Sequence, residues 1–440
     1  MRFSKIGILF CAFLTLLNDR LSETVLLPLL PKLKTEFGLS AFTLGLLAGS
    51  YAISQFIVAP LIGALSDRYG RKPVITFCVA GSVIGLSLFA LSIGLWNTNK
   101  EMLQGGSILI LTLLFAGRVI DGASGGTAAS ATAILADIST PENRTKTFGL
   151  IGAAFGLGFI IGPLLGGLLI GSDAFTRPGQ IAILFAILNL IVVIILLPET
   201  YKPNNNIKIS KRSLNPISQL IKVFKNPLIN RLSLAFFLFF LAFNGLTSFL
   251  LVYLEEVFEW TGNEPILTLN FFVFKFILTK GLLPTLNLVW VGIVAIILQG
   301  FLIGKLVALF GELRLIMSGI GFLVSGCLFL ITANTSNPIP PVFLGCSLLA
   351  IGTGLILPSL RAMISKKLSS SGQGAILGNL QGLQSLGTFC GATIAGLVYG
   401  IDAGIGKGNP FLLGMILLLI VGYLVIGGYS SNRIDSPIPN

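Results

Sequence analysis

The sequence predicts an all-α polytopic membrane protein with twelve transmembrane helices in two six-helix bundles. Three observations support this fold class: the composition is too apolar for a soluble protein, the apolar residues fall in membrane-length runs, and the basic residues collect in alternate gaps between those runs. Of the 440 residues, 54% are hydrophobic and 10% are charged, whereas a soluble domain has about 25% charged residues. The mean hydropathy of +0.92 points the same way.

The composition also limits the chemistry. The chain has no histidine, which excludes an imidazole base, a Ser-His-Asp triad and histidine metal ligands. The five cysteines lie far apart inside apolar runs, without the paired spacing of a metal or redox site. The net charge of +12 is carried in short gaps between those runs, which indicates membrane topology and not nucleic-acid binding. We expect no enzymatic activity, no cofactor, no metal and no nucleic-acid partner. The expected partners of this monomer are the lipid bilayer, a small-molecule substrate and protons.

A helix needs about 20 predominantly apolar residues to cross the hydrocarbon core of a bilayer. Cutting the chain at its charged, proline-rich or Gly-Asn gaps gives twelve such runs. They are residues 6–30, 42–65, 74–95, 108–135, 147–170 and 181–197 in the first half, and 232–254, 288–310, 315–333, 342–364, 376–399 and 411–429 in the second. We therefore expect an N-terminal bundle over 1–197, a basic cytoplasmic linker over 198–231 and a C-terminal bundle over 232–440.

Lysine and arginine fall in every second gap. These gaps are the N-terminus, 68–72, 144–146, the central linker, Lys305 with Arg314, and 361–367. The positive-inside rule places them, and both termini, in the cytoplasm. This asymmetry fits a plasma membrane such as the bacterial inner membrane, and an organellar membrane would look alike.

One apolar segment, residues 266–283, departs from the pattern because it contains Lys275 and Lys280. A lysine in the middle of a membrane is costly. A thirteenth crossing would also move every later loop to the other side and invert the charge pattern. We therefore expect an amphipathic or re-entrant insertion on the outer face over about 255–285.

The first cytoplasmic gap carries a motif of glycines and charges. It reads Gly63-Ala64-Leu65-Ser66-Asp67-Arg68-Tyr69-Gly70-Arg71-Lys72. Its glycines permit a tight turn between helices, and its charges can pair with neighbouring helices and so latch one conformation. A plain basic loop explains the cations but neither the glycine spacing nor the aspartate. The motif resembles the G-x-L-a-D-r-x-G-r-k signature of the major facilitator superfamily. That resemblance implies that Asp67 interacts with the second half and that a motif arginine pairs with the acid at position Asp137.

The fifth span carries a stripe of small residues. Its members are Gly149, Gly158, Gly162, Pro163, Gly166 and Gly167. Glycines four apart share a helix face and allow close backbone approach, while a proline bends the helix. Ordinary close packing is one interpretation. The full spacing also resembles the antiporter motif of the superfamily's drug:proton antiporters, which implies export in exchange for protons.

Charged residues inside the first and fourth spans are the candidates for proton coupling. Arg118 and Asp121 are three apart and share a helix face, in a motif that resembles the family's R-x-x-q-G. A structural ion pair is the alternative. Asp19 lies nine residues before the first proline of an L-P-L-L-P ending, a feature that resembles the tetracycline-efflux (TCR/Tet) branch, and Glu23 follows one turn later. Two acids beside Arg20 in a medium of low dielectric are expected to have different pKa values, as a reversible proton carrier requires.

Away from helix ends, the second-half spans contain no Asp, Glu, Lys or Arg, so a substrate there would meet amides and aromatic rings. The cavity candidates are Asn18, Asn244, Gln299, Gln381 and Gln384. Such amides can equally join helices. Gly85 stands where tetracycline exporters carry an acid, and they also have a second-half histidine that this chain lacks. Tetracycline itself is therefore not the expected substrate.

Together these features predict proton-coupled efflux of a small amphipathic or drug-like compound by alternating access. Arg118 would anchor the acids and could hold an anionic substrate group, while Asp19, with Glu23 or Asp121, would take up the proton. The alternatives are a symporter or uniporter for sugars or organic acids, and a non-transporting receptor or scaffold that keeps the fold.

Overall fold

The structure is a computed structural model that describes residues 5–98, 108–125, 130–131, 134–135, 138, 144–169, 177–200, 215–262, 264–271, 274–367, 373–402 and 404–430. The first half contains α1 (Lys5–Thr24), α2 (Leu29–Glu36), α3 (Ala41–Tyr69), α4 (Arg71–Thr98), α5 (Ile108–Ser124), α7 (Arg144–Leu169) and α8 (Arg177–Leu196). The linker contains α10 (Pro216–Lys225). The second half contains α11 (Asn230–Phe258), β1 (Pro265–Phe271), β2 (Phe274–Thr279), η1 (Lys280–Leu282), α12 (Leu283–Ile296), η2 (Ile297–Leu302), α13 (Ile303–Thr332), α14 (Ile339–Lys366), α15 (Gln373–Tyr399), η3 (Gly406–Gly408) and α16 (Asn409–Ser430).

Each of the twelve predicted spans contains helix within the described residues. Seven continuous helical stretches there are long and apolar enough to cross a membrane by length and composition. The first span is divided into α1 and α2 by a turn ending at Pro28, because proline has no backbone N–H to continue a helix. The eighth and ninth spans meet inside α13 at Gly311, whose φ of 74° lies in the left-handed region that only glycine adopts readily.

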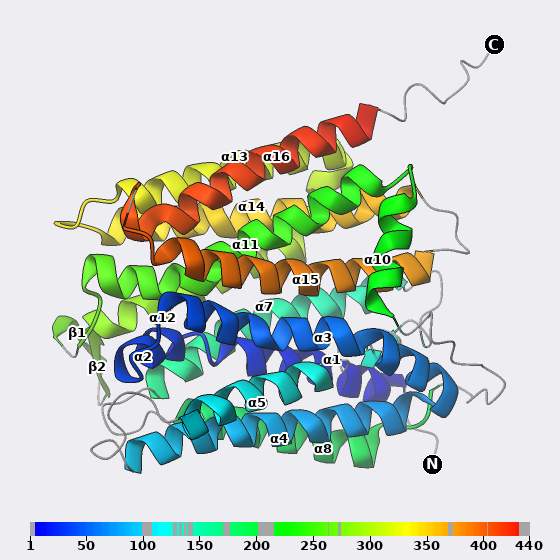
Figure 1. Ribbon diagram of the computed structural model, residues 1–440, viewed down its shortest axis with the longest axis horizontal. Helices are drawn as coiled ribbons and strands as arrows, with labels where there is room; N and C mark the ends of the chain where they lie inside the picture. Colours follow the sequence, from blue (N-terminus) through cyan, green and yellow to red (C-terminus); the bar gives the residue numbers. More distant parts are fainter. Residues whose placement is uncertain are drawn as a thin grey trace.

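The two halves lie against each other along their long axes (Figure 1). The helices α3 and α7 of the first half form the border, where α3 packs on α15 and α7 packs on α12. Helix α10 runs across the end at which α1 begins and α16 ends, and the β1–β2 hairpin lies at the opposite end. The linker helix, the start of α1 and the end of α16 therefore lie at the same end of the molecule.

The segment predicted to be an outer-face insertion forms an antiparallel hairpin, in which Pro265–Phe271 pairs with Phe274–Thr279. Its run of Ile, Leu, Thr, Val and Phe favours strands, and an ion pair of 2.7 Å joins Lys280 to Glu264 beside it. The Lys280 ammonium holds the pKa of the exposed Glu264 carboxyl below its usual range. An open two-stranded sheet has unpaired edges that lipid cannot satisfy. The hairpin therefore favours an insertion outside the hydrocarbon core over an additional span.

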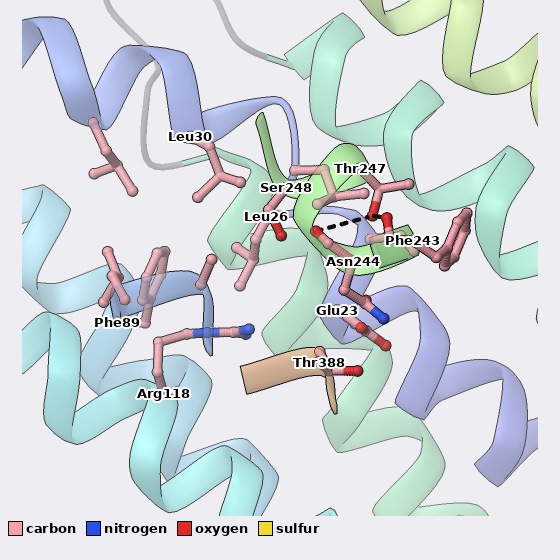
Figure 2. Close-up of a pocket in the computed structure, with 15 residues that line it drawn as sticks. Glu23, Leu26, Leu30, Phe89, Arg118, Phe243, Asn244, Thr247, Ser248 and Thr388 are labelled. Carbon is pink, nitrogen blue, oxygen red and sulfur yellow. Dashed lines mark hydrogen bonds between the residues drawn. The ribbon is translucent and has the colours of Figure 1, made fainter. Parts of the chain in front are cut away.

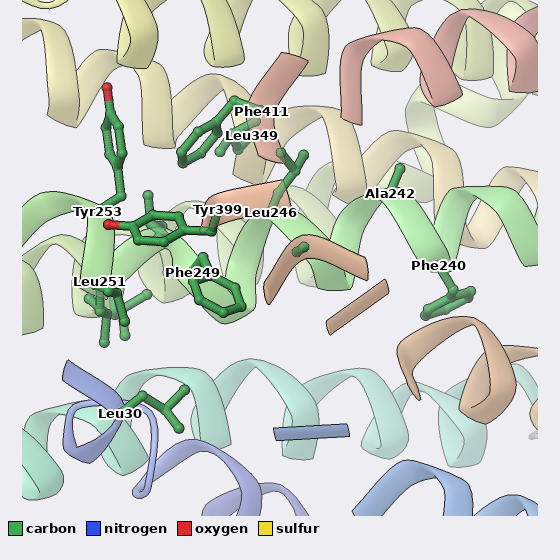
Figure 3. Packing of buried hydrophobic residues seen from close by; sticks show 14 of the residues in the cluster. Leu30, Phe240, Ala242, Leu246, Phe249, Leu251, Tyr253, Leu349, Tyr399 and Phe411 are labelled. Atoms are coloured by element: carbon green, nitrogen blue, oxygen red, sulfur yellow. The ribbon is translucent and has the colours of Figure 1, made fainter. Parts of the chain in front are cut away.

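A buried apolar cluster fills the second half around α11 and extends to the first half at the hairpin end (Figure 3). Tyr253 packs edge-on against Phe411, with ring centroids 4.8 Å apart, and its hydroxyl donates to the Leu330 carbonyl. Phe249 packs against Tyr399 at 5.0 Å. Because Leu30 of α2 belongs to the same cluster, the two halves share one core at this end.

Candidate substrate and proton-coupling site

Two acids and one base form the polar centre of α1. The Arg20 guanidinium bridges them, with Nη2 donating to Asp19 Oδ2 at 2.7 Å and Nη1 donating to Glu23 Oε2 at 2.5 Å. Tyr51 of α3 donates its hydroxyl to the second Asp19 oxygen at 3.1 Å. The Asp19 side chain is 3% exposed and that of Glu23 is 28% exposed. The predicted proximity of these groups is therefore present, and Glu23 is the more accessible acid.

The second predicted pair, Arg118 and Asp121 on α5, is looser. Arg118 Nη1 and Asp121 Oδ2 are 3.9 Å apart, and neither atom has a hydrogen-bond partner although both are buried. The Arg118 guanidinium lies 5.0 Å from the centre of the Tyr51 ring, within reach of a cation–π interaction. Tyr51 thus contacts the α5 arginine with its ring and the α1 acid Asp19 with its hydroxyl. Tyr51 was not among the predicted site residues, although Ser50, Ser54 and Gln55 lie around it on a largely apolar stretch of α3.

Close packing explains why Gly85 of α4 replaces an acid. A Cβ atom at this position would lie 2.6 Å from the Asp121 backbone nitrogen and 2.7 Å from the Gly117 carbonyl. Real Cβ atoms do not approach other atoms so closely. The backbones of α4 and α5 therefore leave no room for a carboxylate side chain here. Their close contact also fixes the position of Asp121 relative to α4.

The glycine stripe of α7 contacts two different helices. Gly158 and Gly162 face α1, and Gly166 faces the turn that follows it; a Cβ at Gly158 would lie 2.5 Å from Arg20 Cβ. Gly167 instead faces Thr285 of α12 in the second half. The stripe therefore seats the acid-bearing helix on one side and the second half on the other. Pro163 is buried within the helix, and the surroundings of Gly149 lie outside the described side chains.

A cavity lies between the halves beside these charges (Figure 2). Its empty volume is about 750 Å³, including space open to solvent. The first half contributes Glu23, Arg118 and an apolar wall, and the second half contributes hydroxyl and amide groups. The labelled lining residues are Glu23, Leu26, Leu30, Phe89, Arg118, Phe243, Asn244, Thr247, Ser248 and Thr388.

A smaller and more polar cavity of about 350 Å³ adjoins the first. Both are lined by Glu23, Ala48, Arg118 and Thr388, and the smaller one adds Arg20, Tyr51, Ala52, Gln55, Gln384 and Ser385. Of the five predicted cavity amides, Asn244 lines the larger cavity and Gln384 the smaller. Asn18, Gln299 and Gln381 line neither of these two cavities.

The second half carries one buried charge at a position that was predicted to lie in a cytoplasmic gap. Arg361 lies inside α14, its side chain is half-buried, and its Nη2 donates to Gln384 Oε1 at 2.7 Å. Its guanidinium also lies 5.8 Å from the Phe236 ring centre. The expectation that the second-half spans are uncharged is therefore wrong at this position. One feature of the sequence could have indicated this: Arg361 precedes the next basic residue, Lys366, by more than one helical turn, and α14 continues to Lys366.

The charged motif after α3 is bonded within the first half. Arg71 pairs with Asp67 at 2.7 Å, and the Glu199 carboxylate accepts from the backbone nitrogens of Arg71 and Lys72 at 2.8 and 3.1 Å. Gly70 has a φ of 101°, and a side chain there would meet Glu199. The predicted bond from Asp67 to the second half is absent among the described contacts.

The remaining motif positions add little contact. The Arg68 guanidinium lies over the ring of its neighbour Tyr69 at 5.3 Å, and Gly63 has open space around it. Asp137, the predicted partner of a motif arginine, lies outside the described residues. The structure therefore does not test the predicted pairing of Asp137 with a motif arginine.

An ion pair joins the halves at the hairpin end. Lys34 of α2 binds Glu256 of α11, whose carboxylate also accepts from Tyr399 and from Lys407, both at 3.0 Å. Among the ion pairs of the described residues, Lys34–Glu256 is the one that connects the two halves. Together with the shared apolar core, it holds this end of the molecule closed.

These features define a polytopic membrane transporter with a central cavity between two helical halves. The family model of the Major Facilitator Superfamily matches residues 8–288, and the chain belongs to this superfamily. Similar proteins include the class C tetracycline resistance protein of Escherichia coli, 30% identical over 92% of this chain and 93% of that protein. Another is multidrug resistance protein 2 of Bacillus subtilis strain 168, 27% identical over 91% of this chain and 90% of that protein.

Solved structures show the same fold. The human organic anion transporter MFSD10 aligns with a TM-score of 0.68 at 24% identity, over 96% of this chain and 99% of that one. A bacterial homologue of the lysosomal transporter Spinster, in an inward-facing conformation, aligns with a TM-score of 0.69 at 16% identity, over 99% of this chain and 100% of that one. The predicted fold class and the predicted resemblance to tetracycline-efflux proteins are confirmed.

Proposed function

We propose that this protein exports a small amphipathic compound across the membrane by alternating access, in exchange for protons. The observation that carries the proposal is the pair of acids bridged by Arg20, of which Glu23, with Arg20 itself, lines the cavity between the halves while Asp19 is buried behind them. Buried charges in a membrane protein are costly unless they serve transport or coupling. Relatives that are named for tetracycline and multidrug resistance support export of a drug-like compound.

The conformation supports an order of events. The outer end is held closed by Lys34–Glu256, whereas Asp67 of the charged motif at the other end pairs with Arg71 of the same half. A compound that enters from the cytoplasmic end would reach the cavity while the outer end is shut. Export then requires the Lys34–Glu256 pair to open and the inner ends of the halves to close.

Protonation supplies the return step. Arg20 forms ion pairs with both Asp19 and Glu23. A proton on either carboxylate removes one of these pairs, and the guanidinium can then bind another acceptor. Such a change alters the relative stability of the two conformations, as a coupled ligand must. Asp19 is the primary proton carrier in this scheme, and Glu23 gives it access to the cavity.

The same scheme places the protein in the plasma membrane, as a bacterial inner-membrane protein, with both termini in the cytoplasm. It acts as a monomer, because residues from both halves of a single chain line the two cavities, and it needs no nucleic-acid partner. Accessibility of single cysteines placed at the chain ends to impermeant reagents tests the orientation.

Everted membrane vesicles test the function. Vesicles with an acidified lumen and a pH-sensitive dye receive a panel of antibiotics, cationic dyes and organic acids, and an exchanged substrate causes proton release. We expect a response from the wild type that Asp19→Asn abolishes. The matched control is Asp402→Asn, which changes an exposed acid at the outer end. Undiminished proton release by Asp19→Asn would refute the assignment, and uptake coupled to inward proton flow would indicate a metabolite symporter.

A further inference from the structure

Arg361 is a cation without a counter-charge in the part of the chain that the structure describes. Its guanidinium donates to the neutral Gln384 and lies against the Phe236 ring. No carboxylate of the described residues lies within ion-pair distance. A positive group in such a position is costly unless a negative group joins it.

The acids of the first half do not supply that group in this conformation. Asp19 and Glu23 both bind Arg20, and Asp121 lies 3.9 Å from Arg118. Arg361 itself lines neither cavity, but it is bonded to Gln384, which lines the smaller one, so its charge raises the positive potential at that polar end.

Arg118 of the first half independently indicates an anionic ligand. Its side chain is 9% exposed, lines both cavities, and has its Nη1 atom buried without a hydrogen-bond partner. Figure 2 shows the side chain extending from α5 into the cavity toward Thr388. A guanidinium nitrogen can only donate, so the missing partner is an acceptor. A carboxylate, sulfonate or phosphate oxygen is the strongest acceptor for a guanidinium.

The two cavities define the rest of the ligand. The larger one has an apolar wall of Leu26, Leu30 and Phe89, which suits a ring or short alkyl body. The smaller one, with Tyr51, Gln55 and Gln384, is lined by polar groups. An amphipathic molecule would place its body in the first and its head group in the second.

We infer that the exported compound is an amphipathic organic anion whose charged group binds between Arg118 and the Arg361–Gln384 pair. This inference rests on the proposed function and names the class of its substrate. Arg118 donates from the first half and Arg361 supplies positive potential from the second. The anion therefore draws the two halves together at the polar end of the cavity.

Three probes with one apolar body test the inference: 2-naphthoate, 2-naphthamide and 2-naphthylmethylamine. Dissociation constants are measured by calorimetry on the purified full-length protein in detergent. We expect the anion to bind at least roughly tenfold more tightly than the amide, as a hydrogen bond to a charged group allows, and the amine to bind most weakly. Arg361→Gln is expected to remove the preference for the anion, whereas Arg361→Lys retains part of it. The matched control Lys305→Gln, at an exposed position of the same half, is expected to leave it unchanged.

Equal affinity of the wild type for the anion and the amide would overturn the inference, and this result needs no variant to fold. An unchanged preference in folded Arg361→Gln would overturn it too, and would assign Arg361 to a conformational ion pair instead. Either result leaves proton release in everted vesicles as a separate test of export. A clear anion preference without any proton release would support the ligand class and refute proton-coupled exchange.

Discussion

Replacing Gly167 with alanine should open the outer end of the protein. Gly167 of α7 and Thr285 of α12 meet across the two halves, and the new Cβ would lie 2.6 Å from Thr285 Cβ. Carbon atoms are in optimal contact at about 3.5–4.0 Å, so the helices must separate by roughly 1 Å. Rotation of the threonine side chain cannot relieve this overlap, because its Cβ is fixed by the backbone.

Overpacking of this kind costs about 1–3 kcal/mol. The cost falls on the conformation with the outer end closed, since α7 and α12 separate there when it opens. A bias of this size changes the ratio of two conformations by about 5–150-fold. Gly167→Ala should therefore convert a closed outer end into a detectable outward-open population.

Pulsed electron–electron resonance between spin labels at Thr35 and Asp402, in a background without the native cysteines, measures this change. These residues are exposed, and they lie on the two halves at the end of the molecule that carries the hairpin. We expect a longer distance in Gly167→Ala, restoration by the second change Thr285→Gly, and no change in the control Gly321→Ala, which has open space. An unchanged distance in folded Gly167→Ala would refute the argument that this contact holds the outer end closed.

Three further predictions concern single contacts. Lys34→Glu should lengthen the same spin-label distance because it places two acids together, and the added Glu256→Lys should restore it; failure of the exchange to restore it would show that this ion pair does not hold the gate. Tyr51→Phe removes one bond to Asp19 and should slow proton release in everted vesicles severalfold with normal insertion, so a wild-type rate would remove Tyr51 from the coupling site. Glu199→Ala leaves two backbone donors at the start of α4 without their acceptor and should lower unfolding stability by about 1–2 kcal/mol, measured by denaturant titration; no loss would mean that water replaces the carboxylate.

Much of the fold could be predicted because its signals are local. The length of apolar runs predicts the helices, and glycines four apart predict that α7 packs closely on a neighbour. The spacing of Asp19 and Glu23 places both on one face of α1, where the structure joins them through Arg20.

The missed features depend on contacts between distant parts of the chain. Tyr51 contacts Asp19 of α1 and Arg118 of α5, and Glu199 accepts a hydrogen bond from the start of α4. Arg361 was assigned to a cytoplasmic gap because basic residues near a helix end usually indicate topology. Its orientation toward Gln384 emerges only when α14 and α15 pack together. The hairpin over 265–279 was also missed, because a short apolar run with two lysines fits an amphipathic helix and a strand equally well.

The most direct test of the central claim is transport into proteoliposomes under an imposed pH gradient. The labelled compound is the one that gives the largest proton release in everted vesicles. With an acidic lumen, wild-type protein and Asp402→Asn should concentrate it inside, and a protonophore should abolish the accumulation. Asp19→Asn should fail to concentrate it while still binding it. Accumulation by Asp19→Asn at the wild-type rate would contradict proton exchange through the acids of α1.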